Sequence, residues 1–497
     1  MDVDMADAQP SQHGKQVGVP VDDAHPFDLE SYISNYTGRT AIFRLIHIIS
    51  HCPTLAPEAY KAAVEHVYQS RDPQLYQQVL SAYESVAASA GTPDAPFPKP
   101  EDIMPLDPKW IDETNARNAN ERVKLEVELK SYTNNMIKES IRMGHRDLGN
   151  FYRAVGDPAT ALKHFTKSRE FCATGQHVLE MCLSVLEELL IEQRNYTHLP
   201  TYVFKAETAL DAAVAQEKSA SSNPMAPAGG VGAGSSGSSA RKQSADRDRI
   251  QSKLDFAQGL ANLGQGYYDK AAYHFLRVGP AKDLEDWAGT LVAPADIAIY
   301  GTLCALSSYS RAAIKAQILE NSVFGAYVEQ EPYVRELIEA YMASKFKVVL
   351  EVLGRYSTRH ALDIHLAPHV SALTTSIRNW AVKLYFQPFQ SIKLDRMSAA
   401  FGWTVEEVER QVVRLIQSGE IQARVDSENK ILLAKKTDYR ADLFERAMKA
   451  GADIQEANRK VLLRMRFQQA DLVIKAPKGH ASQQQQQLEM SMFTQEA

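Results

Sequence analysis

The sequence predicts a mainly α-helical fold: a solenoid of helical repeats, followed by a winged helix and one long C-terminal helix. Apolar residues recur with helical periodicity along most of the 497-residue chain. A phrase of glycine, alanine and phenylalanine is repeated in the middle of the chain. After about residue 387, two short helical patterns precede two runs in which polar and apolar residues alternate. The hydrophobic content of 44% and the charged content of 23% are those of an ordinary globular protein.

The N-terminal part is predicted to be a disordered arm followed by helices. Residues 1–25 are polar and aperiodic, which is typical of disorder. Residues 26–90 are predicted to form N-terminal helical repeats, with helices that begin at Pro57 and after the N-cap residue Asp72. Five prolines in residues 91–107 predict a linker without helix. The apolar face of the first long helix consists of Ile42, Leu45, Ile46 and Ile49.

Residues 108–265 are predicted to form TPR-like helical repeats. In such a repeat, small residues let two antiparallel helices approach, and aromatic side chains fill the gap between them. A degenerate copy of the phrase is predicted around Asn195 and Phe204. The phrase itself consists of Leu148, Gly149, Tyr152, Gly156, Ala161 and Phe165, and its second half recurs at Gly266, Ala271 and Phe275.

Residues 219–249 interrupt these repeats and are predicted to be a flexible insertion. Of the 22 residues 219–240, 19 are Ser, Gly, Ala or Pro and none is charged. Such a segment cannot bury enough apolar surface to offset the entropy of ordering it. The run Gly232–Gly237 has G-x-G-x-x-G spacing, but it lacks the preceding strand and following helix of a dinucleotide site. We therefore expect no cofactor.

Residues 387–436 have the pattern of a winged helix. A helix is predicted over 394–401, where Gly402 ends it. Thr404 is predicted to cap the next helix, because Glu407 follows at the spacing of a capping box. Two strands are then predicted at 420–425 and 430–435, with a turn between them.

The C-terminal region is predicted to be a single helix and a tail. Residues 437–475 keep apolar residues mostly on one helical face, and residues 476–497 are predicted to be disordered. The tail includes the glutamine tract 483–487.

This order of helical repeats, winged helix and terminal helix resembles that of PCI domain proteins, which occur in the proteasome lid, the COP-9 signalosome and translation initiation factor three. The resemblance places a PCI domain at residues 266–436, with a helical part at 266–386. Over roughly residues 30–475 the chain is similar to the family formed by the first subunits of the COP-9 signalosome. The segments that carry this similarity are Tyr36–Leu55, Ile137–Cys172, Ala298–Leu306, Leu366–Val370 and Ala423–Ser427.

The resemblance implies a scaffold subunit that is not an enzyme. The signalosome removes a ubiquitin-like modifier from cullins (deneddylation) and so regulates cullin-RING ubiquitin ligases, and a zinc metalloprotease on another chain performs the cleavage. The resemblance also implies contacts with the second and third subunits through the winged helix, and with all subunits through the terminal helix. Contact with cullin-RING ligases would be indirect. The alternative is a subunit of the proteasome regulatory lid, which shares this architecture.

Two surfaces are predicted to contact these other subunits. The edge of a winged-helix sheet leaves backbone donors and acceptors unpaired. The terminal helix has little of its own chain to pack against. The predicted subunit-interface residues are Ile392, Ile421, Ala423 and Val425 in the winged helix, and Ile454, Val461, Met465 and Leu472 on the terminal helix.

Catalysis, metal binding and nucleic-acid binding are each disfavoured by the residues. The chain has no H-E-x-x-H motif, and Pro368 interrupts any helix that would align its densest histidine cluster, which is His360, His365 and His369. We therefore expect no catalytic residue and no metal ligand. A winged-helix nucleic-acid adaptor is the less favoured reading, because the helix over 404–418 carries a net charge of -1.

Composition and termini predict a soluble protein of the nucleus and cytoplasm. The net charge is -6, and the four cysteines are scattered, as expected for reduced thiols. The first 16 residues include three aspartates and lack the apolar core of a signal peptide. The longest apolar run, Ile297–Leu306, has ten residues, about half of what a bilayer requires. We expect no membrane partner.

Overall fold

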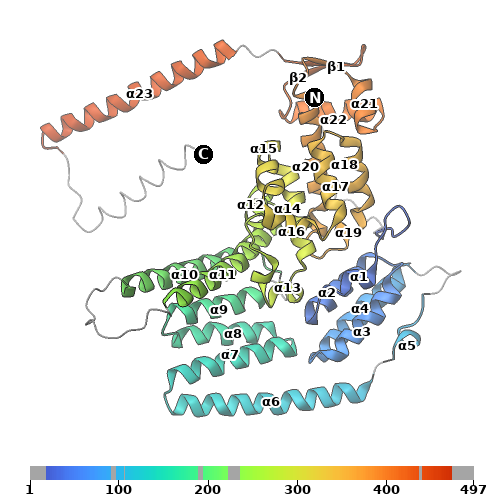
Figure 1. Ribbon diagram of the computed structural model, residues 1–497, viewed down its shortest axis with the longest axis vertical. Helices are drawn as coiled ribbons and strands as arrows, with labels where there is room; N and C mark the ends of the chain where they lie inside the picture. The colour runs from blue at the N-terminus through green and yellow to red at the C-terminus, as the bar shows by residue number, and fades with distance from the viewer. Residues whose placement is uncertain are drawn as a thin grey trace, which may run out of the picture. The chain divides into compact units, whose positions relative to one another are not determined.

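The computed structural model describes residues 18–90, 97–105, 107–188, 194–221, 236–435 and 439–472 (Figure 1). It divides into two compact units, residues 1–421 and 422–497. The predicted tail and residues 1–17 of the predicted disordered arm lie outside the described residues. The prediction of disorder is wrong for residues 18–25, because the Val19 amide bonds the His51 carbonyl at 2.8 Å and the Pro20 carbonyl accepts from Thr358 Oγ1 at 2.7 Å.

The N-terminal helices of the first unit bury their apolar faces in one shared core. The face predicted for the first long helix is buried except at Ile46, which is partly buried against the same core. Asp72 caps the last of these helices, since its carboxylate accepts a hydrogen bond from the Gln74 amide at 2.9 Å. The helices are α1 (Leu29–Ile33), α2 (Gly38–His51), α3 (Ala56–Gln69) and α4 (Pro73–Ala90).

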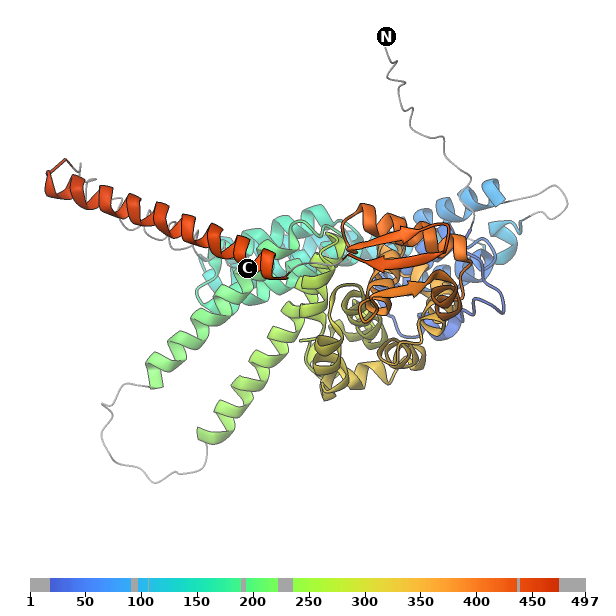
Figure 2. The ribbon, with the colours of Figure 1, turned by 90° about the horizontal axis from the view of Figure 1, so that it is seen from above.

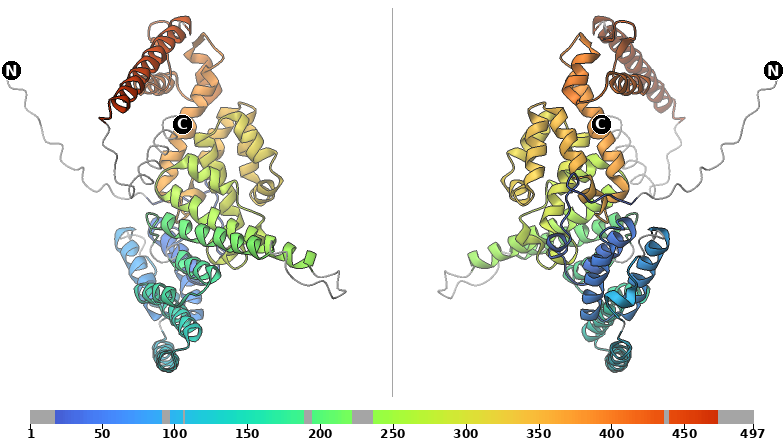
Figure 3. Two further views of the ribbon diagram at one scale, coloured as in Figure 1. Left: turned by 90° about the vertical axis from the view of Figure 1, so that its left-hand side faces the viewer. Right: turned by 90° about the vertical axis from the view of Figure 1, so that its right-hand side faces the viewer.

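The repeat helices follow one another in rows (Figure 1), and α4 packs on the first of them, α6. In the side views the N-terminal helices lie alongside these rows (Figure 3). The repeat helices are α6 (Pro108–Asn134), α7 (Lys138–Val155), α8 (Pro158–Ser168), α9 (Gly175–Glu188), α10 (Leu199–Ser221) and α11 (Ser236–Gly264).

The prediction of no helix in residues 91–107 is wrong for one turn. Residues Pro100–Ile103 form the short helix α5. Proline is tolerated in the first turn of a helix, because its missing N–H would have no helical partner there. Glu101 and Asp102 add negative charge at the same end, which the helix dipole favours. Residues 91–96 and 106 lie outside the described part of the chain.

The prediction that residues 219–249 are a flexible insertion is also wrong at both ends. Helix α10 continues to Ser221, and α11 already begins at Ser236. From Ala240 onward the segment is rich in alanine, arginine, lysine and glutamine, which favour helix more than the Ser/Gly/Pro-rich run before it. The two helices extend as neighbours (Figure 2). Residues 222–235 lie outside the described residues.

The repeated phrase produces the same helix contact twice, 110 residues apart. A Cβ atom on Gly149 would lie 2.6 Å from the Phe165 ring, and one on Gly259 would lie 2.9 Å from the Phe275 ring. In both places a glycine with positive φ follows seven residues later: Gly156 follows Gly149, and Gly266 follows Gly259. The expected third copy is wrong, because Phe204 is 69% exposed and fills no gap between helices.

The helical part that the sequence predicts at residues 266–386 is built around α14 (Pro294–Ser308), in which 12 of 15 residues are buried. Helices α12, α16 and α20 pack against it. The remaining α-helices of this part are α12 (Tyr268–Phe275), α13 (Trp287–Thr290), α15 (Arg311–Ile314), α16 (Ser322–Val328), α17 (Pro332–Met342), α18 (Phe346–Arg355), α19 (Ser357–Ala361) and α20 (Val370–Phe386).

The winged-helix prediction is confirmed in its helices. Strand β1 (Ser391–Lys393) leads into α21 (Leu394–Phe401), which ends at Gly402 with φ of 70°. Helix α22 (Val405–Gln417) begins with the predicted capping box: Glu407 N bonds Thr404 Oγ1 at 3.3 Å, and Thr404 N bonds Glu407 Oε2 at 3.0 Å.

The second unit contains a hairpin and the terminal helix. Strands β2 (Ala423–Asp426) and β3 (Ile431–Ala434) pair antiparallel, with Ala423 opposite Ala434 and Val425 opposite Leu432. The strand predicted from residue 420 begins at 423, because Glu420 N and Ile421 N bond the Leu415 carbonyl at the end of α22. Helix α23 (Tyr439–Gln469) ends before the predicted residue 475.

The repeat contact generates a stability prediction. Replacing Gly149 or Gly259 with alanine should destabilise the chain by about 1–2 kcal/mol, since overpacking against a phenylalanine ring outweighs the gain in helix propensity. Gly354 in α18 has no atom within 4 Å of its built Cβ. Gly354→Ala is therefore the matched control and should stabilise the chain by about 0.5–1 kcal/mol. Urea unfolding measures all three, and stabilisation by Gly149→Ala would contradict the repeat packing.

Candidate functional site

The largest group of buried charged side chains joins α2 to α14 and to the segment after α19. The Arg44 guanidinium is fully buried. Its Nη2 atom lies 3.0 Å from Asp296 Oδ2, and its Nη1 atom lies 2.6 Å from Asp363 Oδ2. Both carboxylates are themselves buried. We call this group the Arg44 cluster; it consists of Arg44, Asp296, Asp363, Arg359, Tyr32, Tyr36 and Tyr300.

Tyrosine hydroxyl groups add hydrogen bonds to the cluster, whereas the buried Arg44 Nε has no hydrogen-bond partner among the described residues. Arg44 Nη1 donates to the Tyr32 hydroxyl at 2.5 Å, and the Tyr36 hydroxyl donates to Asp296. The Tyr300 hydroxyl donates to Asp363 Oδ1 at 2.7 Å. The Arg44 guanidinium carbon also lies 4.0 Å from the centre of the Tyr36 ring. The buried charges are thus paired by salt bridges, hydrogen bonds and ring contacts together.

The electrostatics keep three groups of this cluster in the protonation states that they ordinarily have at pH 7. Burial raises the pKa of Tyr32 to about 12 and holds the pKa of Tyr300 well above its usual value. Burial alone would raise the pKa of the Asp363 carboxyl, but the Arg44 cation and other neighbouring cations outweigh it and hold this pKa well below its usual value. None of these three shifts moves a pKa toward neutrality, so these groups do not supply a general acid or base at pH 7.

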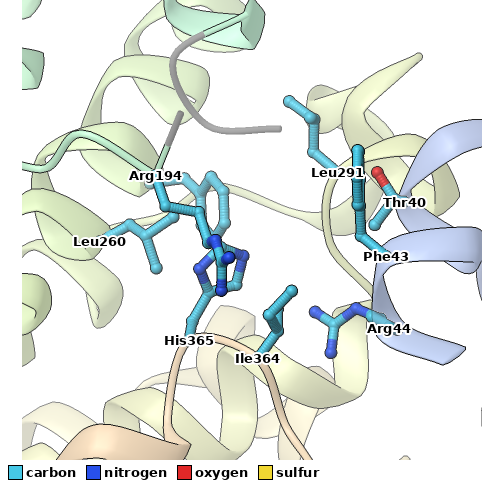
Figure 4. A pocket seen from close by; sticks show the side chains of 9 residues that line it. Thr40, Phe43, Arg44, Arg194, Leu260, Leu291, Ile364 and His365 are labelled. Atoms are coloured by element: carbon cyan, nitrogen blue, oxygen red, sulfur yellow. The ribbon is translucent and has the colours of Figure 1, made fainter. Parts of the chain in front are cut away.

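The cavity beside the cluster is too small for a substrate. Thr40 and Phe43 of α2 line it together with His365 and Ile364 (Figure 4), and its volume is about 20 Å³. Ligand sites typically measure about 300–1,000 Å³. This cavity therefore supports no assignment of a cofactor or substrate.

The predicted histidine cluster is divided among separate tyrosine partners. Burial lowers the pKa of both His360 and His365 to about 3, so both imidazoles are neutral at pH 7. Within the described ranges, no group of three or more His, Cys, Asp or Glu side chains is arranged to hold a metal ion. The three pairs are His360 with Tyr333 at 3.1 Å, His365 with Tyr196 at 2.8 Å and His369 with Tyr268 at 3.3 Å.

Three of the predicted interface side chains are buried within the chain itself. Ile392, Ile421 and Ala423 are 5%, 6% and 7% exposed. They are interior side chains in this structure: Ile392 and Ile421 belong to the first unit, and Ala423 belongs to the second. Val425 is half-buried.

The other four predicted interface residues are exposed. Ile454, Val461 and Met465 on α23 are between 51% and 62% exposed. Leu472 is also exposed, but it lies beyond the end of the helix at Gln469. The predicted interface residues did not include further apolar residues of α23 that are exposed, although the high density of large apolar side chains in this helix could have indicated them. These residues are Leu443, Phe444, Met448, Leu462, Leu463 and Phe467.

Two further observations concern membranes and cysteines. Among the described helices, none combines the length and apolarity needed to cross a membrane. All four cysteines are free thiols.

The Arg44 cluster generates a stability prediction. Arg44→Met should destabilise the chain by about 3–5 kcal/mol, because it leaves two buried carboxylates with too little positive charge. Arg335→Met is the control, since Arg335 pairs with Glu339 on an exposed face and such pairs contribute little. Chemical denaturation compares the two variants. If both variants lower the free energy of unfolding by the same small amount, the structural role of the cluster is contradicted.

The buried histidines generate a pH prediction. Between pH about 6.5 and 3 the unfolded chain binds protons at His360 and His365 and the folded chain does not, so stability falls as the pH falls, by up to about 1.4 kcal/mol per pH unit for each histidine. His360→Gln with His365→Gln should make this loss shallower between pH 6.5 and 4.5. His198→Gln, at an exposed position, should leave the slope unchanged. An unchanged slope in the double variant would refute this assignment.

Two protein families match parts of the chain. The family described as 26S proteasome subunit RPN7 matches residues 107–317, and the PCI domain family matches residues 353–436. The first covers the repeats and extends beyond α14, and the second covers α19, α20 and the predicted winged helix. These matches agree with the predicted order of a helical-repeat region followed by a PCI domain.

Similarity to individual proteins extends over nearly the whole chain. The COP9 signalosome complex subunit 1b of Drosophila melanogaster is 32% identical over 96% of this chain and 92% of its own length. The COP9 signalosome complex subunit 1 of Arabidopsis thaliana is 34% identical over 90% of both chains. The 26S proteasome non-ATPase regulatory subunit 6 of Oryza sativa subsp. japonica is 21% identical over only 40% of this chain and 51% of its own length. The chain therefore belongs to the family of COP9 signalosome complex subunit 1 proteins.

Proposed function

We propose that the chain is a non-catalytic scaffold subunit of a COP-9 signalosome. In this role it supports the removal of a ubiquitin-like modifier from cullins and thereby regulates cullin-RING ligases. The observation that carries the proposal is the exposed apolar surface of α23, which gives the chain a means of joining other subunits.

Four of the exposed apolar residues of α23 share one face of the helix. Leu443, Ile454, Val461 and Met465 follow at intervals of eleven, seven and four residues. At about 100° per residue, these intervals return to nearly the same side of the helix. All four side chains are more than half exposed. This face is the kind of surface that helices present to one another in a bundle.

An apolar face of this length favours a partner over solvent. Every described residue from 440 to 472 is exposed. Burying one large apolar side chain contributes about 1.5–3 kcal/mol, and contiguous exposed apolar surface typically marks an interaction site. We propose that α23 enters a helix bundle with the other signalosome subunits. We further propose that the winged helix contacts the second and third subunits.

The proposal predicts that α23 can be disabled without unfolding the chain. Val461→Asp with Met465→Asp should weaken association with the other subunits by about 2–6 kcal/mol, because two apolar contacts are lost and two carboxylates are buried without partners. The repeats and the winged helix should stay folded, since their cores do not include these side chains. Native mass spectrometry of the co-expressed subunits measures assembly, and circular dichroism measures folding.

The matched control alters charge equally on the opposite side of the helix. Lys449→Gln with Arg459→Gln also changes the net charge by -2, and both positions are exposed. This variant should assemble normally. Equal loss of assembly in both variants would mean that charge, and not the apolar face, governs association. A Val461/Met465 variant that unfolds would place these residues in the chain's own core.

The absence of catalysis is a second part of the proposal, with its own test. The isolated chain should bind no stoichiometric zinc and should release no modifier from a cullin conjugate, because its buried charges are paired and its clustered histidines bond separate tyrosines. Metal analysis of the purified chain, together with a cleavage assay on the conjugate, tests this. One tightly held zinc per chain would overturn the scaffold assignment.

We propose the nucleus and cytoplasm as the location of the chain, and free thiols are typical of these reducing compartments. The proteasome lid is the weaker assignment, since the similarity to its subunit covers 40% of the chain at 21% identity. Native purification of the tagged chain distinguishes the two assemblies. Recovery with cullin-deconjugating activity supports the signalosome, and recovery with the proteasome core supports the lid.

A further inference from the structure

Three arginines line a hollow between α20 and α22 in the first unit. Arg378 comes from α20, and Arg410 and Arg414 come from α22. The hollow has a volume of about 310 Å³, which is within the range of ligand sites. We call it the arginine pocket; its lining residues are Arg378, Trp403, Glu407, Arg410, Gln411 and Arg414.

A side-chain hydrogen bond links the two helices beside the three positive charges. Gln411 Nε2 donates to Asn379 Oδ1 at 2.6 Å, and this bond fixes α22 beside α20 next to Arg378. Arg410 and Arg414 are four residues apart, so they lie on the same side of α22. Like charges at this spacing are unfavourable without a counter-charge.

The described part of the chain provides no salt bridge to these arginines. No described carboxylate lies within 4.0 Å of a guanidinium nitrogen of Arg378, Arg410 or Arg414. Arg410 donates from Nε to the Glu406 backbone carbonyl at 3.3 Å. The one acid lining the pocket, Glu407, bonds the Thr404 amide at 3.0 Å, and its interaction with the Arg410 charge offsets only part of the three positive charges. By contrast, the guanidiniums of Arg44, Arg142 and Arg359 each contact carboxylates.

One wall of the pocket is aromatic. Trp403 is half-buried, and its ring stacks on Phe401 with centres 5.0 Å apart and planes 25° apart. This packing holds the indole in place beside the arginines. The pocket therefore combines a fixed apolar wall with planar donors suited to carboxylates.

We propose that the arginine pocket binds a short acidic peptide segment of a partner protein. Carboxylates of the segment lie among the three guanidiniums, and its apolar atoms lie against Trp403. A nucleic-acid strand fits less well, because its phosphates run past several residues of α22 and would approach Glu406 and Glu409. None of the predicted interface residues lines this pocket, so the proposal goes beyond the assembly role of α23.

The test measures binding of a fluorescent nine-residue peptide, rich in glutamate and containing one leucine, to the full chain by fluorescence anisotropy. Arg410→Gln with Arg414→Gln should weaken binding at least ~10-fold, because two charge-assisted hydrogen-bonding groups are removed. Glutamine keeps the helix propensity of α22. The control is Lys393→Gln with Arg396→Gln, which removes the same charge from exposed positions outside the pocket and should change binding less than about 2-fold.

Each other outcome overturns the proposal. Equal weakening by the two variants would show general attraction to positive charge without a site. Binding weaker than about 1 mM by the wild-type chain would show that the pocket has no affinity for acidic peptide. Tighter binding of a single-stranded oligonucleotide of equal charge, lost in the Arg410/Arg414 variant, would assign the pocket to nucleic acid.

Discussion

The buried Arg44 cation is the constraint on which the first unit depends. It sits on the otherwise apolar face of α2, and its two carboxylate partners lie 252 and 319 residues further along the chain. A buried cation is tolerated only where its partners are in place, so the N-terminal helices and α14 must dock together. Tyr36, Tyr300 and Arg359 extend this requirement to their own segments. The cluster thus specifies how distant segments combine, and hydrophobic burial around it supplies most of the stability.

The first unit is a body in which buried charged side chains such as Arg44 are paired within the chain. Helix α23, in contrast, keeps large apolar side chains exposed. In the first unit, many buried polar side chains find partners within the chain, as the three histidine–tyrosine pairs illustrate. On α23, large side chains such as Phe444 and Ile454 remain more than 60% exposed. A scaffold subunit needs both properties: a body that holds its shape alone and a surface that is completed by neighbours.

Local features were predictable from sequence because their causes are local. The capping box at Thr404 and the helix stop at Gly402 depend on residues a few positions apart, and both are as predicted. The Gly149–Phe165 contact was predictable because its repeat recurs. The Arg44 cluster was not, since no local pattern pairs residues 252 positions apart. Burial of Ile392, Ile421 and Ala423 was missed for a related reason: alternation along a strand does not say which face the chain's own core covers.

Hydrogen–deuterium exchange of the free chain and of the assembled complex tests the central claim most directly, because it measures the body and α23 in one experiment. In the free chain, amides of α2 and α14 should be protected to the same extent, since the Arg44 cluster makes them open together. Amides of α23 should exchange rapidly in the free chain and become protected only in the complex. Equal protection of α23 in both samples, or much faster exchange in α2 than in α14, would contradict the account.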